Sequence, residues 1–156
     1  MQGKSADNRK NTLYDMRIER KRYLQRLVNS RKNGQIKIIT GVRRCGKSYL
    51  LGVLYRDYLL QDGILPEQII TLELDNDINA RYRNPLELGT YLREKVTDTG
   101  TDYYIMLDEI QMVEPIDNPY LPKESDSKIT FVDVLLGLKS LSNVDVYVTG
   151  SNSKML

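Results

Sequence analysis

The segment from Gly41 to Ser48 has the residue types and the spacing that could bind phosphate. It satisfies the pattern G-x-x-x-x-G-K-[ST] and falls between an expected strand and an expected helix. Glycine allows the close backbone approach that points successive N–H groups at phosphate oxygens. Lys47, at the start of the helix, could place its ammonium on the β and γ phosphates of a nucleotide, and Ser48 could offer its hydroxyl to Mg²⁺. The pattern therefore predicts a site for a nucleoside triphosphate and magnesium.

The residues expected to bind the nucleotide run along this loop into the first turn of the helix. Arg43 and Arg44 could touch phosphates, contact a partner or lie in solvent, and the sequence leaves these alternatives open. Cys45 is interpreted as a small loop residue rather than a redox switch. The full set is Gly41, Val42, Arg43, Arg44, Cys45, Gly46, Lys47, Ser48 and Tyr49.

A second candidate group is the acid pair Asp108 and Glu109, which follows the apolar run Tyr104-Ile105-Met106-Leu107. An acid at the carboxyl end of a parallel strand lies at the same edge of the sheet as the phosphate loop. Asp108 could hold Mg²⁺, often through a water, and Glu109 could polarise the water that attacks the γ phosphate. Two acids that end a strand are often only a solvated turn. Their pairing with the phosphate loop favours the functional interpretation.

A third candidate group, Thr149-Gly150-Ser151-Asn152, follows the last expected strand. A polar side chain there would lie between the phosphate loop and the acid pair. Asn152 could sense the γ phosphate or position the attacking water, and it joins Lys47 and Glu109 as a candidate catalytic residue. Ser151 is the competing candidate, and a simple turn that ends the strand stays open as an alternative.

Strands and helices that alternate along the chain must position these groups. Apolar runs predict strands near 36–40, 69–74, 103–107 and 144–148, and helical spacing predicts helices over 12–32, 47–61, 84–96 and 129–141. Asn84-Pro85 is expected to open its helix with a cap and a first-turn proline. The least regular stretch is 114–128. The alternation predicts an α/β fold whose parallel sheet carries its ligand site at the carboxyl ends of the strands.

The composition excludes several kinds of chemistry. The 156 residues contain no His and one Cys, so His-dependent triads, zinc clusters and an intramolecular disulfide are ruled out. No apolar run approaches the roughly 20 residues of a membrane span, and no secretion signal is visible, so a cytoplasmic location is expected. Residues 1–61 carry 15 Lys and Arg against 4 Asp and Glu, and residues 62–156 carry 8 against 17. We expect a disordered tail over 1–11, a basic amphipathic helix over 12–34 and the core over 35–156.

With the three groups in this order, the chain resembles the P-loop ATPases of the AAA+ type. It is most similar to predicted bacterial and archaeal ATPases whose nucleotide domain precedes a C-terminal domain of unknown function. The matching phrases are "ITGVRRCGKS", "LDEIQ" and "VTGSNSKML", and the similarity covers about Tyr23 to Leu156. The resemblance implies a P-loop NTPase three-layer sandwich, ATP and ADP as ligands, Walker A and Walker B roles for the first two groups and a sensor 1 role for Asn152.

Members of that family continue past sensor 1 into a fifth strand, a helical lid and arginines that complete the site. Their sheet order, 5-1-4-3-2, would leave the strand near 36–40 at an edge here, open to self-association. The chain is therefore expected to be an N-terminal fragment that binds ATP and hydrolyses it weakly, because a missing arginine finger is worth roughly 10³ to 10⁵ in rate.

Three functions are compatible with the sequence. The leading hypothesis is a Mg²⁺-dependent ATPase in which hydrolysis drives a conformational change. A small-molecule P-loop kinase shares the loop but needs an acceptor pocket and usually a mobile basic lid, neither of which is visible. A nucleic-acid or protein-partner module could use the cations of the N-terminal helix, namely Arg17, Arg20, Lys21, Arg22, Arg26 and Arg31.

Overall fold

The computed structural model describes residues 18, 20–40 and 46–150, and within them a parallel four-stranded sheet forms the centre of the fold. Its strands lie in the order β1-β6-β3-β2, and each neighbouring pair is parallel. This is the order that the family resemblance implies for its first four strands, so that expectation is confirmed. The strand bounds are β1 (Lys37–Ile39), β2 (Ile69–Glu73), β3 (Tyr103–Asp108) and β6 (Val144–Thr149).

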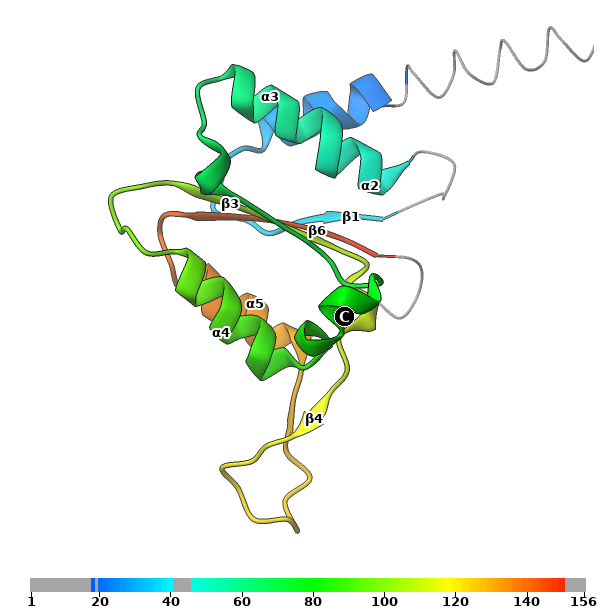
Figure 1. Ribbon diagram of the computed structural model, residues 1–156, viewed down its shortest axis with the longest axis vertical. Coiled ribbons are helices and arrows are strands. Elements are labelled where there is room, and N and C mark those ends of the chain that lie inside the picture. Colours follow the sequence, from blue (N-terminus) through cyan, green and yellow to red (C-terminus); the bar gives the residue numbers. More distant parts are fainter. Residues whose placement is uncertain (1–17, 19, 41–45, 151–156) are drawn as a thin grey trace, which may run out of the picture.

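Helices cover both faces of this sheet and give a three-layer sandwich (Figure 1). One face carries an N-terminal helix over residues 20–29 and a continuous helical stretch over residues 47–61. That stretch consists of α2 (Lys47–Tyr49), the π-helical segment η2 (Leu50–Tyr55) and α3 (Arg56–Gln61), which together match the expected helix. The opposite face is covered by α4 (Pro85–Lys95) and α5 (Phe131–Lys139).

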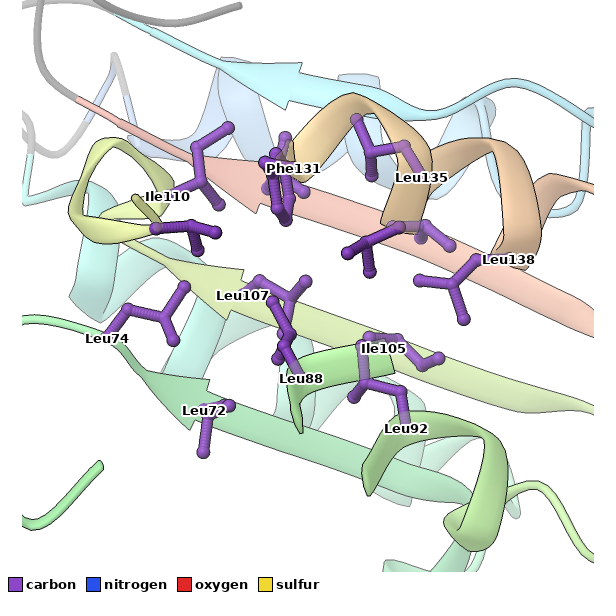
Figure 2. Packing of buried hydrophobic residues seen from close by; sticks show 14 of the residues in the cluster. Leu72, Leu74, Leu88, Leu92, Ile105, Leu107, Ile110, Phe131, Leu135 and Leu138 are labelled. Carbon is purple, nitrogen blue, oxygen red and sulfur yellow. The ribbon is translucent and has the colours of Figure 1, made fainter. Parts of the chain in front are cut away.

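The core divides into two apolar clusters, one on each face of the sheet. The cluster beneath α4 and α5 includes Leu88 and Leu92, which pack toward Ile105 and Leu107 of β3 (Figure 2). Tyr104 and Met106 of β3 belong to the other cluster, beneath the helices at 20–29 and 47–61. Because helices cover both faces, β3 is apolar at every position from Tyr103 to Leu107, which is why this strand was readable from the sequence.

The start of α4 follows the expected capping chemistry. The Asn84 side-chain oxygen accepts hydrogen bonds from the N–H groups of Leu86 at 3.0 Å and Glu87 at 3.3 Å, and Pro85 occupies the first helical position. These contacts satisfy backbone donors that have no partner inside the helix.

Two expected helix boundaries are wrong. The N-terminal helix was expected to reach Lys32, but it ends at residue 29, and Lys32 has a left-handed φ of 57°. Its N–H donates to the Asp145 side chain at 2.9 Å, a contact that stabilises this early turn. The expected positions 12–17 and 19 lie outside the described residues.

The helix expected from Ile129 instead begins at Phe131, because the Thr130 N–H donates to the Asp133 carboxylate at 2.8 Å and so caps the helix there. Ile129 belongs to β5 (Lys128–Ile129), which pairs antiparallel with β4 (Ile116–Asp117). The stretch expected to be irregular is therefore an arm that extends away from the sheet (Figure 1). Three short 3₁₀ segments were not expected: η3 (Pro66–Gln68), η4 (Asp77–Arg83) and η5 (Ile110–Met112).

Strand β1 lies at the edge of the sheet, with β6 as its one strand neighbour among the described residues. Ile38, in the middle of β1, is 48% exposed, although it lies within a β-branched apolar run. The expected edge position is thus confirmed. Over the described ranges, no helix has both the length and the apolar character needed to cross a membrane.

A polar network is buried between the sheet and the helical stretch 47–61. The Lys37 ammonium lies 2.5 Å from one carboxylate oxygen of Asp145, and the Tyr147 hydroxyl donates to the other at 2.5 Å. The hydroxyl groups of Tyr147 and Tyr55 are hydrogen-bonded at 2.5 Å. Burial raises the pKa of both tyrosine hydroxyls well above the ordinary value, so both stay protonated and Tyr147 keeps its donor role.

Candidate phosphate and magnesium site

The carboxyl edge of the sheet brings Ser48, Asp108 and Thr149 together. The Ser48 hydroxyl donates to one carboxylate oxygen of Asp108 at 2.6 Å. The Thr149 hydroxyl donates to the other oxygen, and Thr149 is fully buried. These two bonds fix the Asp108 carboxylate at the start of the helical stretch 47–61. A serine hydroxyl beside a carboxylate offers the hard oxygen ligands that Mg²⁺ prefers.

Lys47 lies at the same edge, with its side chain almost completely buried. Its ammonium donates to the carbonyl oxygen of Gly150 at 2.7 Å, directly after the end of β6. An ammonium carries three donor hydrogens, and this bond uses one of them. Gly46, just before the helix, has a left-handed φ of 62° that glycine adopts without strain. A buried cation at a helix start creates a strongly anion-attracting position.

Glu109 is held in an unusual backbone conformation next to Asp108. Its φ is 59°, in the left-handed region that non-glycine residues seldom occupy. The Glu109 N–H donates to the Thr149 hydroxyl at 3.1 Å, and its carboxylate accepts a hydrogen bond from the Gln111 side-chain amide. Thr149 therefore bonds to both acidic residues, and the backbone turn aims the Glu109 side chain away from the direction that an extended strand would give it.

Thr149, Gly150 and Gln111 also belong to the site, although the sequence predicts no individual role for them. Thr149 and Gly150 were seen only as part of the third group, where Asn152 was chosen. The register of β3 and β6 identifies Thr149 as a site residue. Leu107 pairs with Val148, so the residues that follow them, Asp108 and Thr149, are also neighbours. Gln111 lies two positions after Glu109 and is the last residue of the motif "LDEIQ".

Part of the predicted site lies within the described residues. The structure describes Gly46, Lys47, Ser48, Tyr49, Asp108 and Glu109, and it brings Lys47, Ser48 and both acids to one edge of the sheet. The predicted residues Gly41, Val42, Arg43, Arg44, Cys45 and Asn152, with the alternative Ser151, lie outside the described residues.

The basic residues of the N-terminal segment are partly turned onto the rest of the chain. Four cations between residues 20 and 32 contact aromatic rings or carboxylates. Arg20 lies over Tyr49, Arg26 lies over Tyr23, Arg31 binds Tyr104 and Asp62, and Lys32 pairs with Asp102. Lys21 and Arg22 are exposed.

A parallel α/β sandwich with order β1-β6-β3-β2, and with Lys47 and Ser48 opening the helix after β1, defines a P-loop NTPase-like fold. Comparison with known families agrees: a family model described as an AAA domain matches residues 33–156, and the chain belongs to this family. A relative named "Uncharacterized protein" from Haemophilus influenzae is 33% identical over 139 residues. The match covers 89% of this chain but 31% of the relative. No solved structure matches the chain.

Proposed function

We propose that this chain is the ATP-binding domain of a Mg²⁺-dependent AAA-type ATPase. Membership of the AAA-domain family supports a nucleotide-binding, ATPase-like module. The observation that carries the finer proposal is the 2.6 Å hydrogen bond between Ser48 and Asp108. It joins the first turn after the phosphate loop to the end of β3, which are the two places that a P-loop ATPase uses to hold its metal.

In this proposal each residue of the edge has a distinct task. Lys47 binds the β and γ phosphates with donor hydrogens of its buried ammonium, and the backbone from Gly41 to Gly46 surrounds the phosphates. Ser48 and Asp108 would hold Mg²⁺, which would offset the negative charge of the phosphates. The two hydroxyls that bond to Asp108 orient its carboxylate for this task.

Glu109 is proposed to orient and polarise the water that attacks the γ phosphate. Its backbone is fixed by the bond from its N–H to Thr149, and its carboxylate is oriented by Gln111. A carboxylate placed in this way accepts a proton of the water as the water oxygen bonds to the γ phosphorus. At the same time the bond from the γ phosphorus to the oxygen that bridges it to the β phosphate breaks, and ADP leaves with that oxygen. Asn152 is proposed to assist as a sensor of the γ phosphate. The chain matches 31% of the length of this relative. We propose that ATP hydrolysis here drives movement in other parts of a longer protein.

The two other functions receive less support. A nucleic-acid module would use cations that face solvent, and Lys21, Arg22, Arg26 and Lys32 are exposed. Arg31 and Lys32, however, pair with carboxylates of the chain itself, which leaves less free positive charge on this segment.

A small-molecule kinase would need an acceptor site, and a cavity of about 280 Å³ beside Ser48 and Asp108 has room for a small molecule. Membership of the AAA-domain family favours the ATPase over the kinase. Phosphorylation of an added acceptor, with little ATP hydrolysis in its absence, would favour the kinase over the ATPase.

Asp108→Asn is expected to reduce the effect of Mg²⁺ on ATP affinity. Mg²⁺ should strengthen ATP binding to the unaltered chain relative to EDTA. In the variant this strengthening should fall by about tenfold, because a charge-assisted contact of roughly 1.5 kcal/mol is lost. Calorimetric titration of ATP with and without Mg²⁺ measures both quantities. Asp117→Asn, a change of an exposed carboxylate on the arm, is the matched control. An unchanged effect of Mg²⁺ in Asp108→Asn would refute the metal assignment.

A further inference from the structure

We infer that Glu73, at the end of β2, is a positioning residue for the magnesium ion of the nucleotide site. Ser48 and Asp108 hold the ion in the proposed function, and the Glu73 carboxylate accepts hydrogen bonds from water molecules that the ion keeps. The inference rests on the proposed function. It adds to the site the strand β2, which contains none of the three sequence motifs.

Glu73 lies beside Asp108 in the sheet. The two residues are direct partners in the parallel register of β2 and β3, and Ile69 and Tyr104 are partners four positions earlier in the same strands. Side chains alternate between the two faces of a strand, so positions four apart share a face. Ile69 and Tyr104 both belong to the core cluster beneath the helices at 20–29 and 47–61. Glu73 and Asp108 therefore project from that face, on strands about 4.8 Å apart.

The cavity of about 280 Å³ beside Ser48 and Asp108 is also lined by Glu73. On its helical side lies Gly52, where an added Cβ atom would meet nothing within 4 Å. The cavity adjoins the 2.6 Å hydrogen bond between Ser48 and Asp108, which marks the proposed metal position. A water molecule takes about 30 Å³ in the liquid, so several waters fit between the metal position and Glu73.

The face of β2 toward this cavity is polar, although a strand covered by helices is usually apolar. Thr71 and Glu73 are exposed there, whereas Met106, the register partner of Thr71 on β3, is 2% exposed. The helix above carries Gly52 in its interior, where glycine is destabilising relative to alanine. Natural proteins keep such departures from apolar packing mainly where a function needs them.

The Glu73 carboxylate has no hydrogen-bond partner and no counter-ion among the described residues. Its backbone oxygen accepts hydrogen bonds from the Asn79 side-chain amide at 2.8 Å and from the Asn76 N–H at 3.3 Å, and these bonds fix the end of β2. Like charges on directly paired strand positions are destabilising. A hydrated cation in the cavity offsets the repulsion between the carboxylates of Glu73 and Asp108 and supplies donors to Glu73.

The donor set of this edge fits Mg²⁺. Ser48, Asp108 and Glu73 offer hard oxygen atoms, which suit Mg²⁺ better than a soft metal. Over the described part of the chain, no three acidic, His or Cys side chains gather closely enough to hold a metal by themselves. Mg²⁺ usually keeps several waters and is bound by one or two carboxylates together with substrate phosphates. We therefore expect tight metal binding only with a nucleotide present.

The test measures Mn²⁺ binding in the presence of ADP, from the electron paramagnetic resonance signal of free Mn²⁺. Mn²⁺ prefers the same oxygen ligands as Mg²⁺. Glu73→Gln should bind Mn²⁺ about tenfold more weakly than the unaltered chain, the usual cost of losing a group that hydrogen-bonds to the ligands of a metal. ADP binding in EDTA should stay within twofold of normal. Glu67→Gln, the same change at an exposed glutamate of η3, is the matched control and should bind Mn²⁺ within twofold of normal.

Urea unfolding without metal or nucleotide separates this role from a structural one. Glu73→Gln removes the repulsion with Asp108, so its urea midpoint should equal or exceed that of the unaltered chain. A lower midpoint together with weaker Mn²⁺ binding would assign the effect to the fold and overturn the inference.

The remaining outcomes distinguish this inference from the proposed function. Mn²⁺ affinity within twofold of normal in Glu73→Gln, with weaker binding in Asp108→Asn, would overturn the role of Glu73 and leave the proposed function intact. Equal weakening in Glu73→Gln and Glu67→Gln would reduce the effect to general charge and overturn the inference. Unchanged Mn²⁺ affinity in Asp108→Asn, or no Mn²⁺ binding by the unaltered chain with ADP, would overturn the proposed metal site and this inference with it.

Discussion

Replacing Asp145 by alanine is expected to lower the free energy of unfolding by roughly 3–5 kcal/mol, the usual cost of removing one partner from a buried ion pair. Lys37 would keep its ammonium in a position where its side chain is 8% exposed, without the carboxylate that lies 2.5 Å away. Two further donors, the Tyr147 hydroxyl and the Lys32 N–H, also bond to Asp145. A single carboxylate thus satisfies three groups that are otherwise costly to bury.

Urea unfolding followed by circular dichroism measures this change. Asp117→Ala is the matched control, because it removes the acid from an ion pair whose Lys128 and Asp117 side chains are 53% and 83% exposed, and it should cost less than about 1 kcal/mol. The double variant Lys37→Met with Asp145→Leu should regain part of the lost stability, since no ammonium is left buried. A cost for Asp145→Ala no greater than that for Asp117→Ala would show that the network does not stabilise the fold.

Glu109→Gln is expected to slow ATP hydrolysis by roughly 10² to 10⁴, the usual contribution of a general base. Glutamine has nearly the same shape and can keep a contact with Gln111, but it accepts a proton poorly. The Glu109 backbone N–H would still bond to Thr149, so the turn and the neighbouring Asp108 should stay in place. MgATP affinity should therefore change by less than about threefold, because the phosphates and the metal are held by other residues.

Single-turnover phosphate release, with the chain in excess over ATP, is sensitive enough for the weak hydrolysis expected of this chain. Glu114→Gln provides a control, because it makes the same chemical change at an exposed glutamate five residues further on. Equal rates for Glu109→Gln and the unaltered chain would show that another group activates the water.

Local chemistry explains why much of the fold could be predicted. The four strands appear as apolar runs because helices cover both faces of the sheet, and α4 starts where Asn84 and Pro85 predict. The phosphate loop and the acid pair are visible because their residues are contiguous. The sheet order came from the family resemblance, not from periodicity.

Contacts between distant segments explain what the sequence did not reveal. Lys37 and Asp145 are 108 residues apart, and each looks like an isolated charge in an apolar strand until β1 and β6 are known to be neighbours. Thr149 becomes a site residue only through its register beside Asp108. Ile129 fits a helical pattern as well as a strand, and its pairing with Ile116 decides between them.

We propose above all that the edge formed by Lys47, Ser48 and Asp108 binds the phosphates of MgATP. Calorimetric titration of MgATP into the unaltered chain and into Lys47→Ala tests this most directly. Lys123→Ala, at an exposed lysine of the arm, is the control for charge. We expect the unaltered chain and Lys123→Ala to bind MgATP. Lys47→Ala should bind it more weakly by about 10- to 100-fold or more, because a charge-assisted contact of roughly 1.5–3 kcal/mol is lost. Equal affinity in Lys47→Ala, or no binding by the unaltered chain, would contradict it.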